Sequence, residues 1–257
     1  MQILFPSDFF KSTKPDEMFR EQATAFEKQG MEFSTVNIDE LGAEPKIFPP
    51  IKNKMVLYRG WMLESKNYRS LCRTIEKNGG TPFINLDEYL STHHLPNWYT
   101  KIKEFTPETV VLDINSDLQN ELKKLNWTQF FIKDYVKSLK TSMGSIITIE
   151  QIDTVVQEMK KFRGEIEGGI CVRKVENFYP ETEKRYFVVH GQPYAKDKSD
   201  KISLLVKKCS AKISSKFFSV DVVKTKEGIE RIVEIGDGQV SDIVDWSPDR
   251  LAEILGN

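Results

Sequence analysis

The sequence predicts an α/β fold in two parts, with a parallel sheet in the N-terminal half and a mixed α+β arrangement in the C-terminal half. Strand-like and helix-like segments alternate over the first 115 residues, which is typical of right-handed crossovers and a largely parallel sheet. Further along, apolar strands are joined by short turns, as in antiparallel hairpins. Of the 257 residues, 39% are hydrophobic and 29% charged, so the chain can bury a core and stay soluble.

The N-terminal half is predicted to begin with a strand, a helix and a second strand. Residues 3–7 are apolar and β-prone, and the apolar residues between 18 and 26 fall at helical spacing before Gly30 ends the helix. Residues 32–38 alternate as in a half-buried strand. Because no glycine-rich turn follows the first strand, the sequence argues against a dinucleotide site there.

The same pattern repeats once. Residues 55–58 (MVLY) predict a strand, residues 65–80 predict a helix that ends at Gly79–Gly80, and residues 82–85 predict a short strand. A last strand at 110–114 closes this part. We therefore expect an N-terminal domain over residues 1–115.

The C-terminal half contains both kinds of element. Apolar patterns predict strands at 130–135, 170–175, 217–223 and 229–235, helices at 149–162, 202–209 and 247–255, and a hairpin at 185–195 that turns at His190–Gly191. Thr148 and Gln151 could form a capping box. Ser247 is the expected N-cap of the last helix, with Pro248 at its first position.

Composition argues against several classes of protein. The net charge is -1, with 37 basic and 38 acidic residues, so no general field attracts nucleic acid, although a local basic patch stays open. No apolar run approaches the ~20 residues that span a bilayer, and the first residues lack the basic region of a signal peptide. We expect a cytoplasmic protein without a membrane partner. The three scattered cysteines indicate buried hydrophobes. His93 and His94 could bind a metal, but a surface loop is their expected place.

The segment FSVDVVKTKEGIERIVEIGDG is the most informative local feature. It predicts a β-hairpin that turns at Glu227–Gly228. A two-residue turn there places Thr225 opposite Glu230 and, further out, Asp221 opposite Glu234. Opposed residues have Cβ atoms about 4.5–5.5 Å apart, and the neighbours of both acids are apolar. Either the pKa values of the two carboxyls differ widely or a cation lies between them, and magnesium with substrate phosphates fits this geometry. The alternative is a solvated face with two ordinary acids.

A lysine strand and a polar loop suggest phosphate binding. Lys133 shares a strand face with Phe131 and Tyr135, so it either snorkels at an edge or pairs with an anion. The next loop is basic and hydroxylated, with Lys137, Lys140, Thr141, Ser142, Gly144 and Ser145. Such loops offer N–H groups and ammonium charge to phosphates, although the P-loop pattern is absent and a solvated basic turn is the alternative.

Two charged residues open a later strand. Arg185 follows Glu183 by two positions in ETEKRYFVVHG. An arginine there can hold a phosphate bidentately, and the carboxylate can accept from ribose hydroxyls. The alternative is a surface ion pair of small energetic value.

The order of these features resembles the ATP-grasp superfamily over about residues 116–257, and most closely its branch of ligases that add glutamate to ribosomal protein tails. The strings VEIGDGQVSDI and YRGWM are also similar to small bacterial and phage ATP-grasp proteins of unassigned substrate. The resemblance implies a parallel-sheet pre-ATP-grasp domain over 1–115 and an ATP-grasp domain over 116–257. The latter would have two α+β subdomains, a lid over 116–168 and a core with the metal hairpin over 169–257.

The resemblance also implies a role for individual residues. Those expected to contact the phosphates are Lys133, Lys140, Ser142, Gly144 and Ser145. Arg173, Lys174 and Val175 would form the hinge strand whose backbone reads adenine, Glu183 would bind the ribose, and Arg185 would steady the reacting phosphate.

The implied metal ligands are Asp221 and Glu234. The usual final ligand of the family is an Asn two residues after the Glu, and this chain has Gly236 there. Asp237 is next in line and could substitute, so the coordination of a second metal is in doubt.

The activity implied by the resemblance is that of an ATP- and Mg²⁺-dependent ligase that forms a C–N bond through an acyl phosphate and releases ADP. Its substrates would be small-molecule or peptide carboxylates and amines, Mn²⁺ could replace Mg²⁺, and a homo-oligomer could form. Lys140 and Arg185 would act in catalysis. Arg59, at the end of strand 55–58, could bind a substrate carboxylate or cap the strand at the surface, and Gln239 could line the acceptor site. A phosphotransferase, a non-catalytic nucleotide-binding protein and a plain α/β binding module stay open as alternatives.

Overall fold

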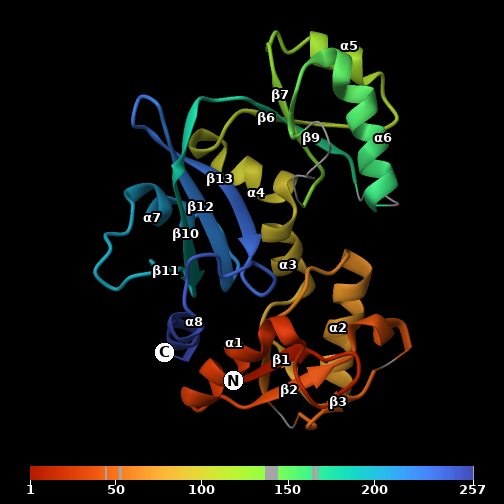
Figure 1. The fold of residues 1–257 in the computed structure, drawn as a ribbon, viewed down its shortest axis with the longest axis vertical. Coiled ribbons are helices and arrows are strands. Elements are labelled where there is room, and N and C mark those ends of the chain that lie inside the picture. Colours follow the sequence, from red (N-terminus) through yellow and green to blue (C-terminus); the bar gives the residue numbers. More distant parts are fainter. Residues whose placement is uncertain (44, 52–53, 137–143, 164–165, 167, 257) are drawn as a thin grey trace. The chain divides into compact units, whose positions relative to one another are not determined.

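The computed structural model describes residues 1–43, 45–51, 54–136, 144–163, 166 and 168–256 (Figure 1). It divides into two compact units. Unit 1 comprises Met1–Thr92, Arg185–Val220 and Gly236–Asn257, and unit 2 comprises His93–Lys184 and Asp221–Ile235. These units do not follow the expected boundary at residue 115. Among the described residues, no helix combines the length and the apolar character that a membrane crossing requires.

Unit 1 contains the expected parallel sheet. Its strands are β1 (Gln2–Pro6), β2 (Phe33–Val36), β3 (Ile47–Phe48), β4 (Met55–Tyr58) and β5 (Thr81–Pro82), in the order β3-β2-β1-β4-β5. All neighbours are parallel except β2 and β3. Strands β1 and β4 have almost no exposed side chains, as expected where helices cover both faces of a parallel sheet.

Three helices pack on this sheet. Helix α1 (Arg20–Lys28) follows η1 (Glu17–Phe19) and connects β1 to β2. Helix α2 (Ser65–Lys77) connects β4 to β5, whereas η2 (Ile38–Ala43) follows β2. Because the strand order runs in opposite directions from β1 and from β4, right-handed crossovers place α1 and α2 on opposite faces. Helix α8 (Pro248–Gly256) packs beside α1 (Figure 1), and Ser247 caps it as predicted.

A second sheet has the order β11-β10-β12-β13. Its strands are β10 (Phe178–Val189), β11 (Gln192–Tyr194), β12 (Phe217–Thr225) and β13 (Glu230–Asp237), and α7 (Leu204–Ser210) lies between β11 and β12 in sequence. The predicted turn at His190–Gly191 is confirmed, since Val189 pairs with Gln192. Both turn residues have positive φ, 49° and 77°, which suits a tight hairpin turn.

Unit 2 is built on an antiparallel sheet, β6-β9-β7-β8. The strands are β6 (Thr109–Leu112), β7 (Phe130–Lys133), β8 (Ile146–Ile147) and β9 (Ile170–Lys174), and the helical segments are α4 (Leu95–Ile102), η3 (Lys103–Phe105), α5 (Leu118–Lys123), η4 (Ile149–Gln151) and α6 (Ile152–Arg163). The capping box of Thr148 and Gln151 is confirmed.

The expectation that strand 110–114 closes the N-terminal sheet is wrong, because β6 pairs with β9. Two helices that the sequence pattern missed precede β6 along the chain. Helix α3 (Leu86–His93) ends where unit 1 gives way to unit 2, and α4 is the first helix of unit 2. The strand therefore belongs to the sheet of unit 2.

The two faces of the unit 2 sheet differ. One face, with Phe130, Ile132 and Val172, packs against α5 and α6 in an apolar core, which is seen beside those helices in Figure 1. Because side chains alternate along a strand, Phe131 and Lys133 of β7 lie on the other face. Register places Phe131 opposite Arg173 and Lys133 opposite Cys171 on that same face. The sheet thus presents two cations on the side away from its helices.

The histidine pair and the cysteines are largely buried. His93 and His94 lie at the end of α3 and the start of α4, so the expected surface loop is wrong. Cys171 and Cys209 are free and buried, as predicted, and Cys72 is half-buried.

The turn between β12 and β13 is one residue longer than expected. Thr225 N–H donates to Ile229 O at 2.8 Å, and Gly228, with φ of 83°, closes the turn by donating to Thr225 O. Thr225 is therefore opposite Ile229, and the predicted two-residue turn is wrong. At the other end of the hairpin, Gly238 N–H donates to Phe217 O. Strand β13 has nine residue steps where β12 has eight, so β13 contains one bulged residue in the stretch that includes Glu234.

Candidate nucleotide site

Unit 2 contains a cavity of about 330 Å³. Its lining combines apolar walls with cations and acids, and the residues are Pro107, Phe131, Lys133, Ile146, Arg173, Lys174, Val175, Glu176, Phe178, Pro180, Glu183, Val223, Val233 and Glu234. The lining therefore brings together five of the predicted nucleotide-site residues, Lys133, Arg173, Lys174, Val175 and Glu183, and one predicted metal ligand, Glu234. Apolar walls with a few charged groups are typical of a small-molecule site.

Lys133 and Glu234 form the electrostatic centre of this cavity. The Lys133 side chain is 3% exposed, and its Nζ lies 4.0 Å from Oε1 of Glu234, whose side chain is 39% exposed. A buried ammonium needs a charged or hydrogen-bonding partner, and one acid at 4.0 Å is a loose one. The site can therefore accept a further anion beside Lys133.

Arg173 supplies a second buried cation. Its Nη1 donates to Val233 O at 2.6 Å, Nη2 donates to Oγ1 of Thr106, and the guanidinium lies 6.0 Å from the ring centroid of Trp98. Its Nε is buried without a hydrogen-bond partner. Burial lowers the pKa of Arg173 to about 10, against which the Glu234 carboxylate acts to raise it, so the group stays cationic at neutral pH. The sequence suggested only a backbone role here; its pairing with Phe131 is what turns the side chain into the cavity.

The hinge segment after β9 is clamped from one side. Arg231 of β13 donates from Nε and Nη2 to both oxygens of Glu176, at 2.9 and 2.8 Å. Its Nη1 and Nη2 also donate to the carbonyl oxygens of Glu104 and Thr106. Such a bidentate pair fixes orientation as well as distance. Arg231 therefore holds the cavity-lining Glu176 in place.

Replacing Arg231 with lysine tests this clamp. Lysine keeps the charge but loses the fork of donors, so we expect a loss of about 1–2 kcal/mol in the free energy of unfolding and about five- to tenfold weaker binding of an ATP analogue. Chemical denaturation and isothermal titration calorimetry measure the two effects. Arg69→Lys, at an exposed position of α2, should change neither. Equal behaviour of both variants would show that the clamp does not shape the cavity.

The other two predicted acids of unit 2 differ in exposure. Asp221 is buried on β12, two residues before the cavity-lining Val223, so the alternation of the strand places both side chains on one face. Glu183 is exposed at the cavity edge. Within the described ranges, no group of three or more His, Cys, Asp or Glu side chains is arranged to hold a metal ion.

Arg59, which the sequence placed near a substrate, lies in unit 1. It is 1% exposed, so the alternative of a surface arginine is wrong. It donates from Nε to Oε1 of Gln22 at 2.7 Å and from Nη1 to Gln239 O at 2.8 Å. Burial lowers the pKa of Arg59 to about 10. These bonds tie the end of β4 to the segment after β13, which is a positioning role rather than open substrate binding.

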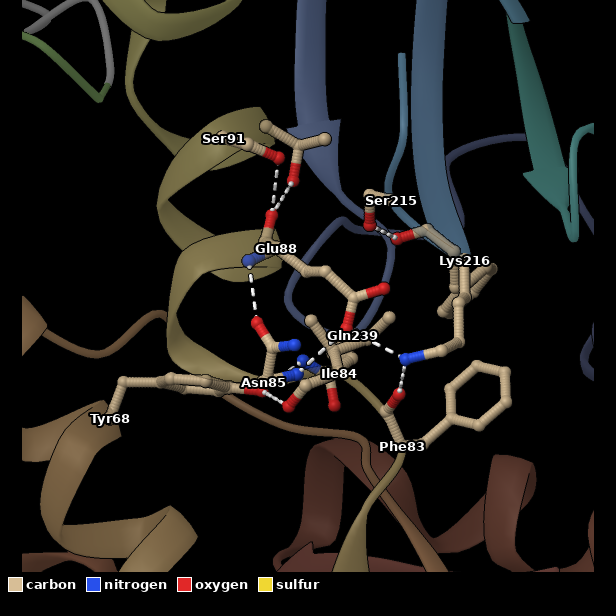
Figure 2. A network of polar contacts seen from close by, with 11 residues as sticks. Tyr68, Phe83, Ile84, Asn85, Glu88, Ser91, Ser215, Lys216 and Gln239 are labelled. Carbon is tan, nitrogen blue, oxygen red and sulfur yellow. Dashed lines mark hydrogen bonds and ion pairs between the residues drawn. The ribbon is translucent and has the colours of Figure 1, made fainter.

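Asp237 is also buried in unit 1. Its Oδ1 accepts from the backbone and side-chain N–H groups of Gln239, and its Oδ2 is buried without a partner. The Gln239 amide continues to the hydroxyl of Tyr68 at 2.7 Å, and Figure 2 shows this contact beside the Lys216 ammonium, which binds Phe83 O and Glu88. Burial raises the pKa of Asp237 to about 8, opposed first by the hydrogen bonds from Gln239. A carboxyl that already accepts from protein donors in this way is a weaker substitute metal ligand.

The raised pKa of Asp237 predicts a pH effect. The folded protein keeps a proton that the unfolded chain releases above pH 3.8, so stability falls as the pH rises from about 4 toward 8 and then levels off. Asparagine cannot titrate, and Asp237→Asn should raise the melting temperature more at pH 8 than at pH 5. Asp249→Asn, at an exposed position, is the control. Equal shifts at both pH values would contradict the raised pKa.

Arg185 also belongs to unit 1. Its Nη1 donates to Asp242 O at 2.7 Å, while its own carbonyl accepts from Nε1 of Trp246. The end of β10 is thus tied to the segment 242–246.

The sequence of residues 102–255, more than half of the chain, matches the model of one family, described as an ATP-grasp domain of clade family 3. The chain belongs to this ATP-grasp family. Curated proteins offer no sequence match. The predicted resemblance to ATP-grasp proteins and the predicted mixed α/β fold class are both confirmed.

Solved ATP-grasp structures share the fold over the whole chain. D-cycloserine synthetase DcsG has a TM-score of 0.64 at 10% identity and covers 100% of this chain and 99% of its own. A RimK domain ATP-grasp protein from Sphaerobacter thermophilus DSM 20745 has a TM-score of 0.64 at 13% identity, with 100% and 97% covered. ATP-grasp ligase PsnB, complexed with minimal precursor, Mg and ADP, has a TM-score of 0.58 at 11% identity, with 98% and 96% covered. At these identities the likeness shows the ATP-grasp ligase fold alone.

One departure from the expected ATP-grasp pattern has a structural reason. A Cβ added at Gly236 would lie 2.7 Å from Oγ of Ser241 and 3.1 Å from Oγ of Ser219. These two hydroxyls lie 2.7 Å apart and bond to each other. A side chain at 236 therefore has no room, and glycine is required where the family has Asn.

The predicted phosphate loop is described only at its end. Lys140 and Ser142 lie outside the described residues. Gly144 has a φ of 78°, and Ser145 O accepts from Ile132 N at 2.8 Å, so the described end of the loop is tied to β7 beside Lys133.

Proposed function

We propose that this chain is an ATP- and Mg²⁺-dependent carboxylate–amine ligase that acts through an acyl phosphate and releases ADP. The observation that carries the proposal is the pair of buried cations, Lys133 and Arg173, which line one cavity together with Glu234. Two cations held out of water attract a polyphosphate strongly, because their fields are poorly screened. The ATP-grasp ligase fold supports the same function.

The nucleotide would lie along the cavity from hinge to cations. Lys174 N–H already donates to Glu108 O, so backbone groups of Val175 and Glu176 are the candidates for the adenine edge. Glu183, at the cavity edge, would accept from the ribose hydroxyls. Lys133 would neutralise charge on the phosphates, and Lys140, Ser142, Gly144 and Ser145 would close over them. Arg173 would add charge from the β9 side.

Asp221 and Glu234 would hold the metal. Both carboxylates offer oxygen donors, which magnesium prefers together with phosphate oxygens, and Glu234 faces the cavity with only a loose contact to Lys133. When bound, Mg²⁺ or Mn²⁺ supplies charge neutralisation for phosphoryl transfer. Asp237 is the weaker candidate, because Gln239 occupies one of its oxygens.

The protein's part in the reaction is positioning and charge. A substrate carboxylate attacks the γ-phosphate of ATP, which gives an acyl phosphate and ADP; an amine then attacks the acyl carbon and phosphate leaves. Lys133, Lys140 and Arg185 would stabilise the negative charge in these steps. No nucleophilic side chain is needed.

A screen for ADP release tests the activity. We expect release that needs Mg²⁺ and both a carboxylate and an amine, drawn from amino acids and short peptides, with an amide product in the mass spectrum. A phosphorylated product without an amide would instead indicate a phosphotransferase. Tight ATP binding without turnover would favour a non-catalytic nucleotide-binding protein, which Gly236 also favours because it offers no side-chain donor for a final metal ligand.

A further inference from the structure

Unit 1 presents large apolar side chains on the loops that follow β1 and β4. Phe9 and Phe10 are each 88% exposed, and their rings contact edge to face with centroids 5.1 Å apart. Trp61 and Met62, after β4, are 44% and 40% exposed. Single exposed apolar residues are ordinary, but a group of them on neighbouring loops is typical of a binding surface.

The Phe9–Phe10 loop is rigid rather than loose. Ser7 and Pro15 form a β-bridge across its base, and Asp8 N–H donates to Lys14 O at 2.8 Å. At its tip, Oδ1 of Asp8 accepts from the N–H groups of Phe10 and Lys11. Both rings are thus held out into solvent by hydrogen bonds, and such pre-organisation lowers the entropic cost of binding.

The two loops lie at the place in the sheet where ligands bind in open α/β folds. Strand order β3-β2-β1-β4-β5 reverses its direction between β1 and β4. A crevice forms outside the carboxyl ends of the strands at such a switch point. Trp61 joins the two loops, since Nε1 donates to Oδ2 of Asp16 and its ring contacts Phe19.

Charge on this surface favours an acidic occupant. A cavity of about 320 Å³ lies next to the first loop, lined by Lys11, Lys14, Pro15, Arg20, Ala23, Thr24, Glu27 and Phe33. Arg20 is paired with Asp8. Among the described residues, Lys11 and Lys14 form no ion pair, and both are exposed. Two unpaired ammonium groups beside two exposed rings match a segment that carries both carboxylates and apolar side chains.

We propose that this surface, defined by Phe9, Phe10, Lys11, Lys14 and Trp61, docks an acidic peptide segment with apolar side chains. The inference rests on the proposed function and names its substrate class, a peptide or protein rather than a free amino acid. The surface spans two loops, which is more than one amino acid can cover. A nucleic acid is disfavoured, because the chain has a net charge of -1 and the only unpaired cations on this described surface are the two lysines.

Fluorescence anisotropy without ATP tests the proposal, so that its outcome does not depend on ligase activity. The probe is a fluorescein-labelled decapeptide of eight glutamates and two leucines. We expect a Kd below about 1 mM for the wild type, and at least tenfold weaker binding for both F9S/F10S and K11E/K14E. The matched controls are Leu204→Ser, 66% exposed, and Lys196→Glu, both in unit 1. Neither should change the Kd.

Several results would overturn the proposal. They are failure of the wild type to bind the peptide, an unchanged Kd in F9S/F10S, or tighter binding of a ten-nucleotide oligo(dT) than of the peptide. A dimer in light scattering that F9S/F10S converts to a monomer would assign the surface to a second copy instead. Because both rings are almost fully exposed, F9S/F10S should keep the wild-type melting temperature and its stabilisation by Mg-ATP. Loss of that stabilisation in the wild type would instead count against the proposed function.

Discussion

Replacing Lys133 with methionine should weaken the binding of a non-hydrolysable ATP analogue by at least about 100-fold. Methionine keeps much of the length of the buried side chain but removes its charge, and the ammonium is one of two buried cations that line the cavity. Isothermal titration calorimetry with Mg²⁺ present measures the effect. Stability should change less than binding, because removing a poorly paired buried charge also removes its desolvation cost.

A matched lysine makes this result specific. Lys224 is exposed on β12, outside the cavity lining, and Lys224→Met should leave the affinity within about twofold. A folded Lys133→Met protein that binds the analogue as tightly as the wild type would place the nucleotide elsewhere.

Replacing Glu234 with glutamine should remove the dependence of ATP binding on magnesium. In the wild type, we expect Mg²⁺ to tighten binding by at least about tenfold relative to EDTA. In the variant, this ratio should fall to about one, while binding in EDTA stays equal or improves because a carboxylate facing the phosphates is gone. Turnover, once substrates are known, should fall by at least about 100-fold.

Glu230→Gln is the control for this variant. Glu230 lies on the same strand but does not line the cavity, so its ratio of affinities with and without Mg²⁺ should match the wild type. If Glu234→Gln also keeps the wild-type ratio, the metal is held by other residues.

Much of the fold followed from local pattern. The parallel β1, β2 and β4, the turn at His190–Gly191 and the caps of α6 and α8 are set by neighbours in sequence, so periodicity and turn residues predict them. The assignment of strand 110–114 failed because its partner, β9, lies some sixty residues away. No local pattern reports which of two sheets a short apolar strand will join.

The candidate site shows the same division. Lys133 and Glu234 could be predicted, because each carries a charge in an otherwise apolar strand. Three features depend on distant contacts: the buried Arg173 side chain, the Arg231–Glu176 clamp and the bulge in β13. The hairpin register was predicted from turn length, and a single extra turn residue changes every pair near it. Arg59 has no local sign of burial, since its partners Gln22 and Gln239 come from opposite ends of the chain.

The most direct test is a crystal structure with a non-hydrolysable ATP analogue and Mg²⁺. We predict the base beside Val175 and Glu176, the phosphates within hydrogen-bond distance of Lys133 Nζ, and a metal ion bound by Glu234. A triphosphate bound outside the unit 2 cavity, with Lys133 and Glu234 untouched, would contradict the proposed site.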